Sequence, residues 1–302
     1  MYKKEANERD FQYILGYLMT NPQSLDSFLN SGKLDNSFDH INSSTIAELL
    51  DFFSVESVRV GTIAQILDER LMKNVLRFLP LTGKLVYSSI KFQQIWKKFR
   101  FSFSSVRWSE PRYCALDFCN YCIKNKKLLG FDENLPLYNL IRYEQAILTV
   151  DIYFRSRQLL NRPLAKLSEE GYPALLAQCI LNDYDFSITE FVKQLKKTTS
   201  DSIAVVPVIS EGFIKESLLT YVSWIDRRIH MLRVNPLIAH LLMECNGRFS
   251  LAQLTQRLKR RGYPATVLLN LCNTIHELEK LGVVQRLAEP LISLIEKEVC
   301  ND

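Results

Sequence analysis

The sequence has no long apolar stretch and few of the motifs that mark common enzymes. No apolar run approaches the ~18 residues of a membrane-spanning helix. The first residues, MYKKEANERD, are charged and lack the apolar region of a signal peptide. We therefore expect a cytoplasmic protein without a membrane partner. The sequence also has no glycine-rich phosphate loop, no nucleophile elbow and no HExxH motif, which argues weakly against enzymatic activity.

Histidines are also few, and their spacing does not suit a metal site. The four histidines are His40, His230, His240 and His276, and no two of them have metal-ligand spacing. A multinuclear iron site needs several histidine and carboxylate ligands, and the sequence has no such constellation. We therefore expect neither a metal nor another cofactor in this chain.

The seven cysteines include one cluster, formed by Cys114, Cys119 and Cys122. Zinc and iron–sulfur sites place C-x2-C pairs on turns, whereas this segment has helical periodicity. On a helix, Cys119 and Cys122 share a face, and Cys114 is rotated by about 140° from Cys119. We therefore expect buried structural thiols in a reducing compartment. A metal or redox site on this cluster is the alternative.

What the sequence does contain is typical of a globular protein. It has 302 residues, of which 47% are hydrophobic and 24% charged, and a net charge of +5. This length suggests about two domains of ~100–200 residues each. In residues 1–160 apolar side chains recur every three or four positions, which predicts a helical bundle that docks on a partner. Residues 161–201 are predicted to form short helices and a linker, and residues 288–302 a tail helix.

Capping residues predict where some of the helices begin. Thr45 and Glu48 fit a capping box at the start of one helix, and Thr62 is a second predicted start. Between the bundle and the linker we expect two short helices, Ala174–Leu181 and Ile188–Lys196.

The pattern changes after residue 201, where β-branched and aromatic residues become frequent. Ser202–Ile209, Ser217–Ile225 and Arg228–Val234 predict a three-stranded antiparallel meander. Three helices and a short strand are predicted to follow, at Pro236–Cys245, Ser250–Arg260, Pro264–Leu281 and GVVQRL. The chain is therefore predicted to be α+β, with a winged-helix module at residues 202–287.

The third helix of this module favours peptide binding over DNA binding. Base readout needs polar or basic side chains in the N-terminal half of that helix, but this half reads PATVLLNLC. Beyond its core stripe the helix has a second, mostly apolar stripe. A free strand edge beside such a helix accepts an added β-strand, and the nearby arginines favour an acidic peptide.

We therefore predict a peptide-binding groove between the third strand and the second stripe of the third helix. Its residues are Ile229, His230, Met231, Leu232, Arg233, Ala265, Leu269, Cys272 and His276. Two alternatives remain: the stripe packs on the N-terminal domain, or the module is a winged-helix regulator that binds DNA.

Two segments of the helical half carry candidate partner-binding residues. Arg142, Tyr143 and Glu144 lie on the otherwise apolar segment LYNLIRYEQAILTVDIYF. A charged pair there is buried either at a subunit interface or in an internal salt bridge. Trp108, in the aromatic segment FRFSFSSVRW, belongs either to an exposed patch for a partner or to the helical core.

The module resembles the PqqD-like recognition elements, which bind leader peptides in ribosomal peptide maturation. The resemblance rests on the order of strands and helices and on the segments RVNPLIAHLLMECNGRFSLAQLTQRL and ELEKLGVVQ. The helical segment WSEPRYCALDFCNYC…LPLYNLIRYEQAI is similar to the N-terminal region of proteins that partner multinuclear non-heme iron oxidases. The combination is most similar to the MbnC-like family of methanobactin biosynthesis. The partner proteins of thiaglutamate biosynthesis are a close alternative.

This resemblance implies a non-catalytic subunit in a heterodimer with an MbnB-like iron oxidase. The recognition element would bind the leader of a ribosomally made, MbnA-like precursor peptide. The partner would hold the iron and convert precursor cysteines to oxazolone–thioamide groups. No nucleic-acid partner is implied.

Overall fold

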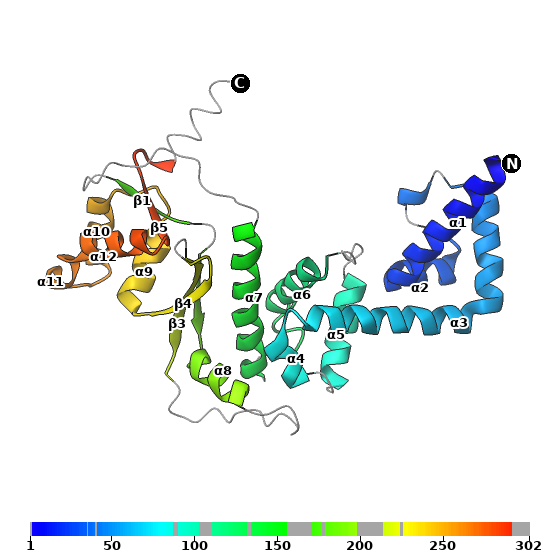
Figure 1. The fold of residues 1–302 in the computed structure, drawn as a ribbon, viewed down its shortest axis with the longest axis horizontal. Helices are drawn as coiled ribbons and strands as arrows, with labels where there is room; N and C mark the ends of the chain where they lie inside the picture. The colour runs from blue at the N-terminus through cyan, green and yellow to red at the C-terminus, as the bar shows by residue number, and fades with distance from the viewer. Residues whose placement is uncertain are drawn as a thin grey trace. The chain divides into compact units, whose positions relative to one another are not determined.

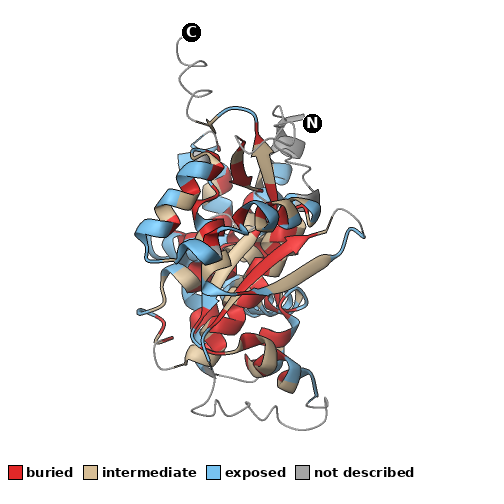
Figure 2. Cartoon of the chain, turned by 90° about the vertical axis from the view of Figure 1, so that its left-hand side faces the viewer, coloured by how far each residue is buried: buried red, intermediate tan, exposed pale blue. Residues whose placement is uncertain are grey.

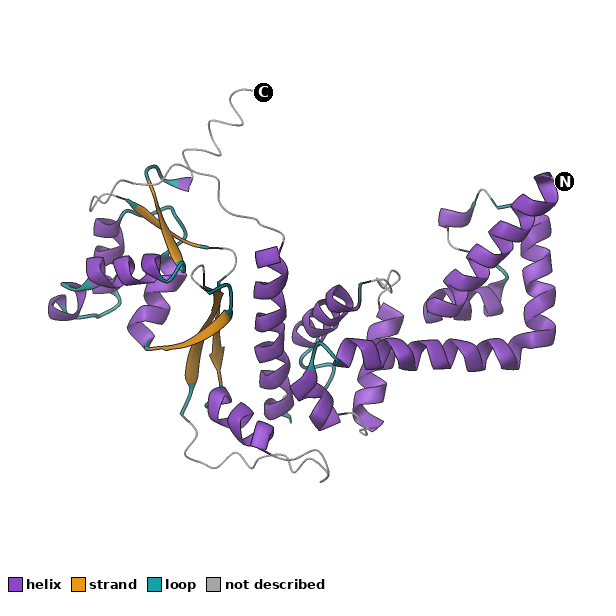
Figure 3. Cartoon of the chain, viewed as in Figure 1, coloured by secondary structure: helices purple, strands orange, loops and turns teal. Residues whose placement is uncertain are grey.

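In a computed structural model the chain forms two compact units, Met1–Glu133 and Asn134–Asp302. The structure describes residues 2–34, 36–39, 41–86, 90–102, 110–131, 134–155, 171–176, 179–197, 214–223 and 226–291. Helices and small antiparallel sheets are both present (Figures 1 and 3), so the α+β class is confirmed. Within the described ranges, no helix combines the length and the apolar character needed to cross a membrane.

The first unit is helical throughout its described residues. Its elements are α1 (Tyr2–Thr20), α2 (Pro22–Ser31), the 3-10 helix η1 (Asn36–Phe38), α3 (Ser43–Leu76), α4 (Pro80–Val86), α5 (Ile90–Ser102) and α6 (Pro111–Lys124). Leu49, Phe53 and Val60 of α3 pack with side chains of α1 and α2. The same helix also packs against α6, so it joins two parts of the unit.

Helix α3 is a single helix of 34 residues, where the sequence predicted two. The Thr62 hydroxyl donates a hydrogen bond of 2.9 Å to the Val58 carbonyl inside this helix, so Thr62 does not begin a helix. The N-cap is Asn42, whose side chain accepts a hydrogen bond of 3.2 Å from the backbone N–H of Ser44. The predictions were wrong because hydroxyl side chains also occur within helices, bonded to the preceding turn.

The second unit combines helices with two small sheets. Its helices are α7 (Leu135–Arg155), α8 (Ile188–Lys197), α9 (Pro236–Glu244), α10 (Leu251–Arg260), α11 (Ala265–Leu268) and α12 (Leu271–Lys280). Its strands are β1 (Tyr172–Leu175), β2 (Ile180–Tyr184), β3 (Glu216–Val222), β4 (Ile229–Val234) and β5 (Val284–Leu287). The sheet orders are β2-β3-β4 and β1-β5, and every pairing is antiparallel.

The three-stranded sheet confirms two of the predicted strands and includes one that was not predicted. The segments Ser217–Ile225 and Arg228–Val234 overlap β3 and β4, and the remaining strand of the sheet is β2. The predicted helix Ala174–Leu181 was wrong, because its first two residues belong to β1 and its last two to β2. A short apolar run fits either structure, and pairing with a distant strand decides between them. The predicted strand Ser202–Ile209 lies outside the described residues.

Helices cover both faces of this sheet. Helix α7 packs against β2, β3 and β4. On the other face, Leu219 and Tyr221 of β3 join a core with apolar residues of α9, α10 and α12. The central strand β3 is therefore buried along most of its length, whereas β4 is mainly half-buried (Figure 2).

The boundary between the units differs from the predicted one. The sequence placed α7 in a helical domain of residues 1–160, whereas the division falls after Glu133. The reason is the packing of α7 on the three-stranded sheet. The predicted tail helix begins at residue 288, and its residues 292–302 lie outside the described part of the chain.

The C-terminal helices follow the sequence signals closely. Helix α9 lies at its predicted place. The Ser250 side chain caps α10, with Gln253 completing a capping box. The predicted third helix is divided into α11 and α12 by a turn at Leu269 and Asn270. The core positions of this region are still buried, among them Leu271 and Ile275.

Candidate binding edge at strand β4

Strand β4 is an edge strand in the described part of the chain, because it pairs only with β3. Ser223 donates its backbone N–H to the Arg228 carbonyl at 3.0 Å, which identifies a hydrogen-bonded pair just before β4. Hydrogen-bonded and non-hydrogen-bonded pairs alternate in an antiparallel ladder. The backbone groups of Ile229, Met231 and Arg233 therefore point away from β3.

The side chains of β4 divide between the two covered faces of the sheet. Leu232 and Val234 lie opposite Leu219 and Ser217 and face the core with α9. Ile229, Met231 and Arg233 occupy the alternate positions, on the face of α7. Ile229 and Met231 are half-buried, and Arg233 is exposed. Within the described ranges, the predicted strand residues therefore form an unpaired edge between two packed faces.

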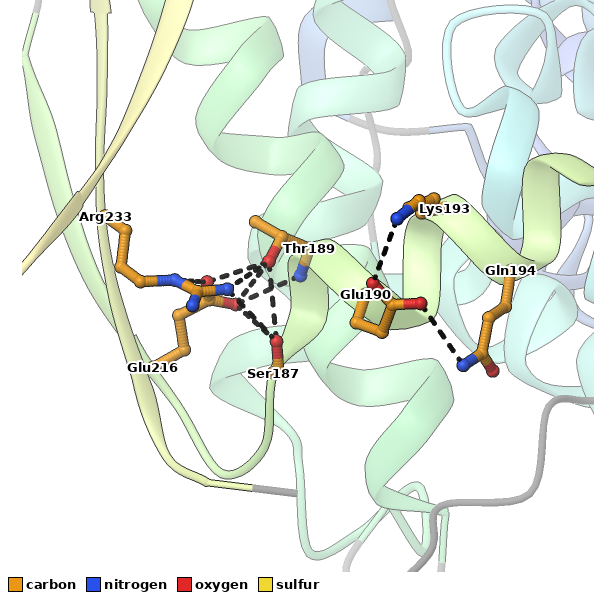
Figure 4. Close-up of polar contacts among 7 residues, drawn as sticks. All are labelled: Ser187, Thr189, Glu190, Lys193, Gln194, Glu216 and Arg233. Carbon is orange, nitrogen blue, oxygen red and sulfur yellow. Dashed lines mark hydrogen bonds and ion pairs between the residues drawn. The ribbon is translucent and has the colours of Figure 1, made fainter. Parts of the chain in front are cut away.

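A buried carboxylate holds the Arg233 side chain in place (Figure 4). Glu216, at the start of β3, has a side chain that is only 2% exposed and lies 2.5 Å from Arg233 Nε. Thr189, in the first turn of α8, donates its backbone N–H at 3.0 Å and its hydroxyl at 2.8 Å to the same carboxylate. A buried charge is tolerated when it is paired and hydrogen-bonded in this way.

Glu216 was missed in the sequence, although the hairpin contains a signal for it. Counting residues outward along both strands from the turn at Asp226 pairs Ser217 of β3 with Val234 of β4. Glu216 therefore lies diagonally beside Arg233, within reach of a long side chain. Thr189 could not be found in this way, because α8 and the hairpin are separated in the sequence.

His230 contacts the turn that precedes β4. Its Nε2 atom lies 2.9 Å from Asp226 Oδ2, and its ring stacks on Tyr221 at 5.7 Å between centroids. The pKa of Asp226 is lowered mainly by the hydrogen bond from the backbone N–H of Arg228, and less by the hydrogen bond with His230. The contact between Asp226 and His230, four residues apart, therefore holds the turn that leads into β4.

The opposite edge of the sheet, at β2, is covered by a side chain of α7. Arg142 Nη1 donates to the Asp183 carbonyl at 2.6 Å, and its guanidinium lies 5.3 Å from the centroid of the Tyr184 ring. Asp183 also bears a charged side chain, a common protection of edge strands. The two edges of the sheet are therefore different in chemistry.

These contacts bear on the predicted partner interface. Arg142 binds the sheet of its own unit. The pKa of Tyr143 is raised mainly by burial, and less by the negative charges of Glu144 and Glu216. Glu144 is buried as well. A role of Arg142, Tyr143 and Glu144 at a partner interface stays a prediction, and Trp108 lies outside the described residues.

The second half of the predicted groove lies on α11, α12 and the turn between them. Ala265, Leu269 and Cys272 are exposed, Leu269 to 80%, and His276 is half-buried. Helix α12 packs along β5, whereas β4 packs against α9 and α7. The stripe is exposed as predicted, but the two halves of the groove lie against different elements.

The basic cluster at the end of α10 is partly neutralised. Arg257 and Arg261 lie 2.8 and 2.5 Å from the carboxylate of Glu244, whose side chain is 7% exposed. Arg257 also lies over the Phe249 ring, 4.3 Å from its centroid. The hydrogen bond from Arg257 is the main cause of the lowered pKa of Glu244. Arg257 and Arg261 therefore have an internal role.

The clustered cysteines are buried in α6, as predicted. Cys114, Cys119 and Cys122 are free thiols with exposed fractions of 1% or less. Burial raises the pKa of Cys114 to about 12 and that of Cys122 further. In the described ranges, no three His, Cys, Asp or Glu side chains are grouped as a metal site would require.

Comparison with known proteins gives no further assignment. No protein-family model matches the chain, and no curated protein matches it significantly.

Proposed function

We propose that the chain is a non-catalytic binding subunit that takes up an extended peptide as an added strand on β4. The observation that carries this proposal is the outward backbone of Ile229, Met231 and Arg233. Edge strands of soluble proteins are usually protected by proline, lysine or a covering element. The β4 sequence IHMLRV contains no proline or lysine, and its one arginine, Arg233, is paired with Glu216. On the opposite edge, Arg142 of α7 donates to a backbone carbonyl of β2.

The finer proposal is that the C-terminal module is a winged-helix recognition element of the PqqD-like type. The sequence of elements β3, β4, α9, α10 and α12 supports it, since a hairpin is followed by three helical segments. The exposed stripe on α11 and α12 supports a second contact surface for the same ligand or for a partner. Five buried free thiols fit the proposed cytoplasmic location, because cytosolic thiols remain reduced.

The proposed peptide is the leader of a ribosomally made precursor, and the proposed partner is a multinuclear non-heme iron oxidase. Both rest on the resemblance of the sequence segments described above. Binding of the leader by this chain would hold the precursor cysteines close to the partner's iron site and raise their effective concentration there. A cysteine-modifying pathway such as thiaglutamate biosynthesis is the alternative setting.

A backbone substitution tests strand addition. Met231→Pro removes an N–H that points away from β3, so the sheet itself loses no hydrogen bond. We expect the affinity for a fluorescein-labelled leader peptide, measured by anisotropy, to fall at least tenfold. The matched control Met231→Ala keeps the N–H and removes only side-chain contacts, so it should bind more tightly than Met231→Pro. Equal binding by Met231→Pro and the unsubstituted protein would refute strand addition at β4.

Co-purification tests the partner. The chain, the oxidase and the precursor are expressed together, and the precursor is expected to be retained only when the chain is present. If the leader binds the oxidase alone equally well, the presenting role is wrong.

A further inference from the structure

We infer that the peptide taken up by β4 carries an acidic side chain, followed two and four residues later by apolar side chains. This inference rests on the proposed function and specifies the class of peptide. It follows from the juxtaposition of the outward-pointing backbone of β4 with the Arg233 guanidinium, which Glu216 and Thr189 hold at the end of that strand.

The register of the added strand follows from the alternation in β4. Ile229, Met231 and Arg233 present outward backbone groups, so they form the hydrogen-bonded pairs with the peptide. Both pairings within this sheet are antiparallel. An antiparallel peptide meets Arg233 first, Met231 two residues later and Ile229 four residues later. Directly opposed side chains lie on the same face of a sheet, about 5 Å apart between Cβ atoms.

The position opposite Arg233 suits a carboxylate. The Arg233 side chain is 66% exposed, and its Nε and Nη2 atoms donate to Glu216 and Thr189. In the described part of the chain, Nη1 donates to no side chain. Since Glu216 already balances the formal charge of Arg233, the preference arises from directed donors. A carboxylate accepts a charge-assisted hydrogen bond from them, whereas a lysine offers no acceptor.

The held guanidinium favours this interaction further. An arginine in solution must lose side-chain freedom when it binds. Arg233 is already fixed by Glu216, while Thr189 Oγ1 lies 2.9 Å from its Nη2 atom. Glu216 therefore limits the freedom of the Arg233 side chain, and the peptide carboxylate would have to reach the remaining donors of the guanidinium.

The two following positions suit apolar side chains. Met231 and Ile229 are half-buried and lie on the same face of the sheet as Arg233. Peptide side chains opposite them extend this apolar surface and exclude water from it, which is favourable in proportion to the area covered. Polar side chains at these positions would lose hydration without gaining a partner among the three β4 residues.

A peptide series tests the inference. Three fluorescein-labelled decapeptides share the core X-Thr-Val-Thr-Val, in which X is Glu, Gln or Lys. We expect the Glu peptide to bind about tenfold more tightly than the Lys peptide, the effect of one charge-assisted hydrogen bond. In Arg233→Met this ratio should fall to near one. Because that substitution leaves Glu216 buried without its cation, the double variant Arg233→Met/Glu216→Gln is measured as well.

The Met231→Pro variant distinguishes a failure of strand addition at β4 from a failure of the acidic position opposite Arg233. If the peptides bind, lose affinity in Met231→Pro, but show the same Glu-to-Lys ratio with and without Arg233, the acidic position is wrong and strand addition stands. If binding is absent or insensitive to Met231→Pro, strand addition itself fails.

Discussion

At the residue scale, two buried carboxylates of the second unit are paired with arginines from neighbouring elements. Glu216 binds Arg233, and Glu244 binds Arg257 and Arg261. The Glu216–Arg233 pair follows from the register of the β3–β4 hairpin, which the sequence suggests. The pairs of Glu244 do not follow from a sequence pattern, because they depend on the way in which α10 packs on α9.

The Glu244 pairing predicts a pH-dependent contribution to stability. Its folded pKa lies below the ordinary value, so its contribution is present above the unfolded pKa and is lost as pH falls through the folded one. We expect Glu244→Gln to lower the unfolding free energy at pH 7 by about 1–3 kcal/mol, with a smaller difference in acid. Urea unfolding from pH 7 to pH 3 measures this.

The control for this pair is Glu277→Gln. Glu277 also binds a cation, Lys280, but its side chain is 65% exposed, and exposed pairs contribute little. We expect no change beyond experimental error in this variant. An effect of Glu244→Gln that is the same at every pH would contradict the ion-pair explanation.

The buried cysteines should be chemically inert in the folded protein. Burial raises the pKa values of Cys114, Cys179 and Cys245 to about 12, and the thiolate is the reactive form. In a Cys272→Ser/Cys300→Ser variant we expect no rapid reaction with Ellman's reagent at pH 8. The five remaining thiols should react after addition of guanidinium chloride. Rapid labelling of the folded variant would support a functional role for one of them.

At the element scale, helices with strong local sequence signals were predicted correctly, whereas elements with weak local signals were missed. Helix α10 (Leu251–Arg260) closely matches the predicted helix Ser250–Arg260. Strands β1 and β2 were missed because each is short and is fixed by a strand far away in the sequence, β5 or β3. The continuity of α3 was missed because Thr62 is compatible with both the start and the interior of a helix.

Gly61 tests the continuity of α3. It lies in the middle of this helix, and an added Cβ would meet no atom within 4 Å. Replacing an interior helical glycine with alanine stabilises a helix by about 0.5–1 kcal/mol. We expect Gly61→Ala to raise the unfolding free energy of the chain by this amount, measured by urea denaturation.

Gly32→Ala is the contrasting variant. Gly32 follows α2 with a φ of 66°, which alanine adopts only with strain, so we expect a loss of stability. If Gly61→Ala were neutral or destabilising, an interruption of the helix at Thr62 would be the better description.

At the scale of the whole molecule, the sequence predicted the α+β class and most of the C-terminal elements. It did not predict the membership of α7 in the second unit, because an apolar helix gives no sign of the surface on which it packs. For the candidate site, the edge strand and the exposed stripe were both predicted. The elements that pack beside the strand and the stripe were not predicted. Helix α12 packs along β5, whereas β4 packs along α9 and α7.

Amide hydrogen exchange in β4, followed by NMR with and without saturating Glu-Thr-Val-Thr-Val peptide, tests strand addition most directly. Strand addition predicts slower exchange at Ile229, Met231 and Arg233 in the complex. The amides of His230 and Leu232 already face β3 and should change little. Unchanged exchange at the three outward amides in the saturated complex would contradict peptide binding at this edge.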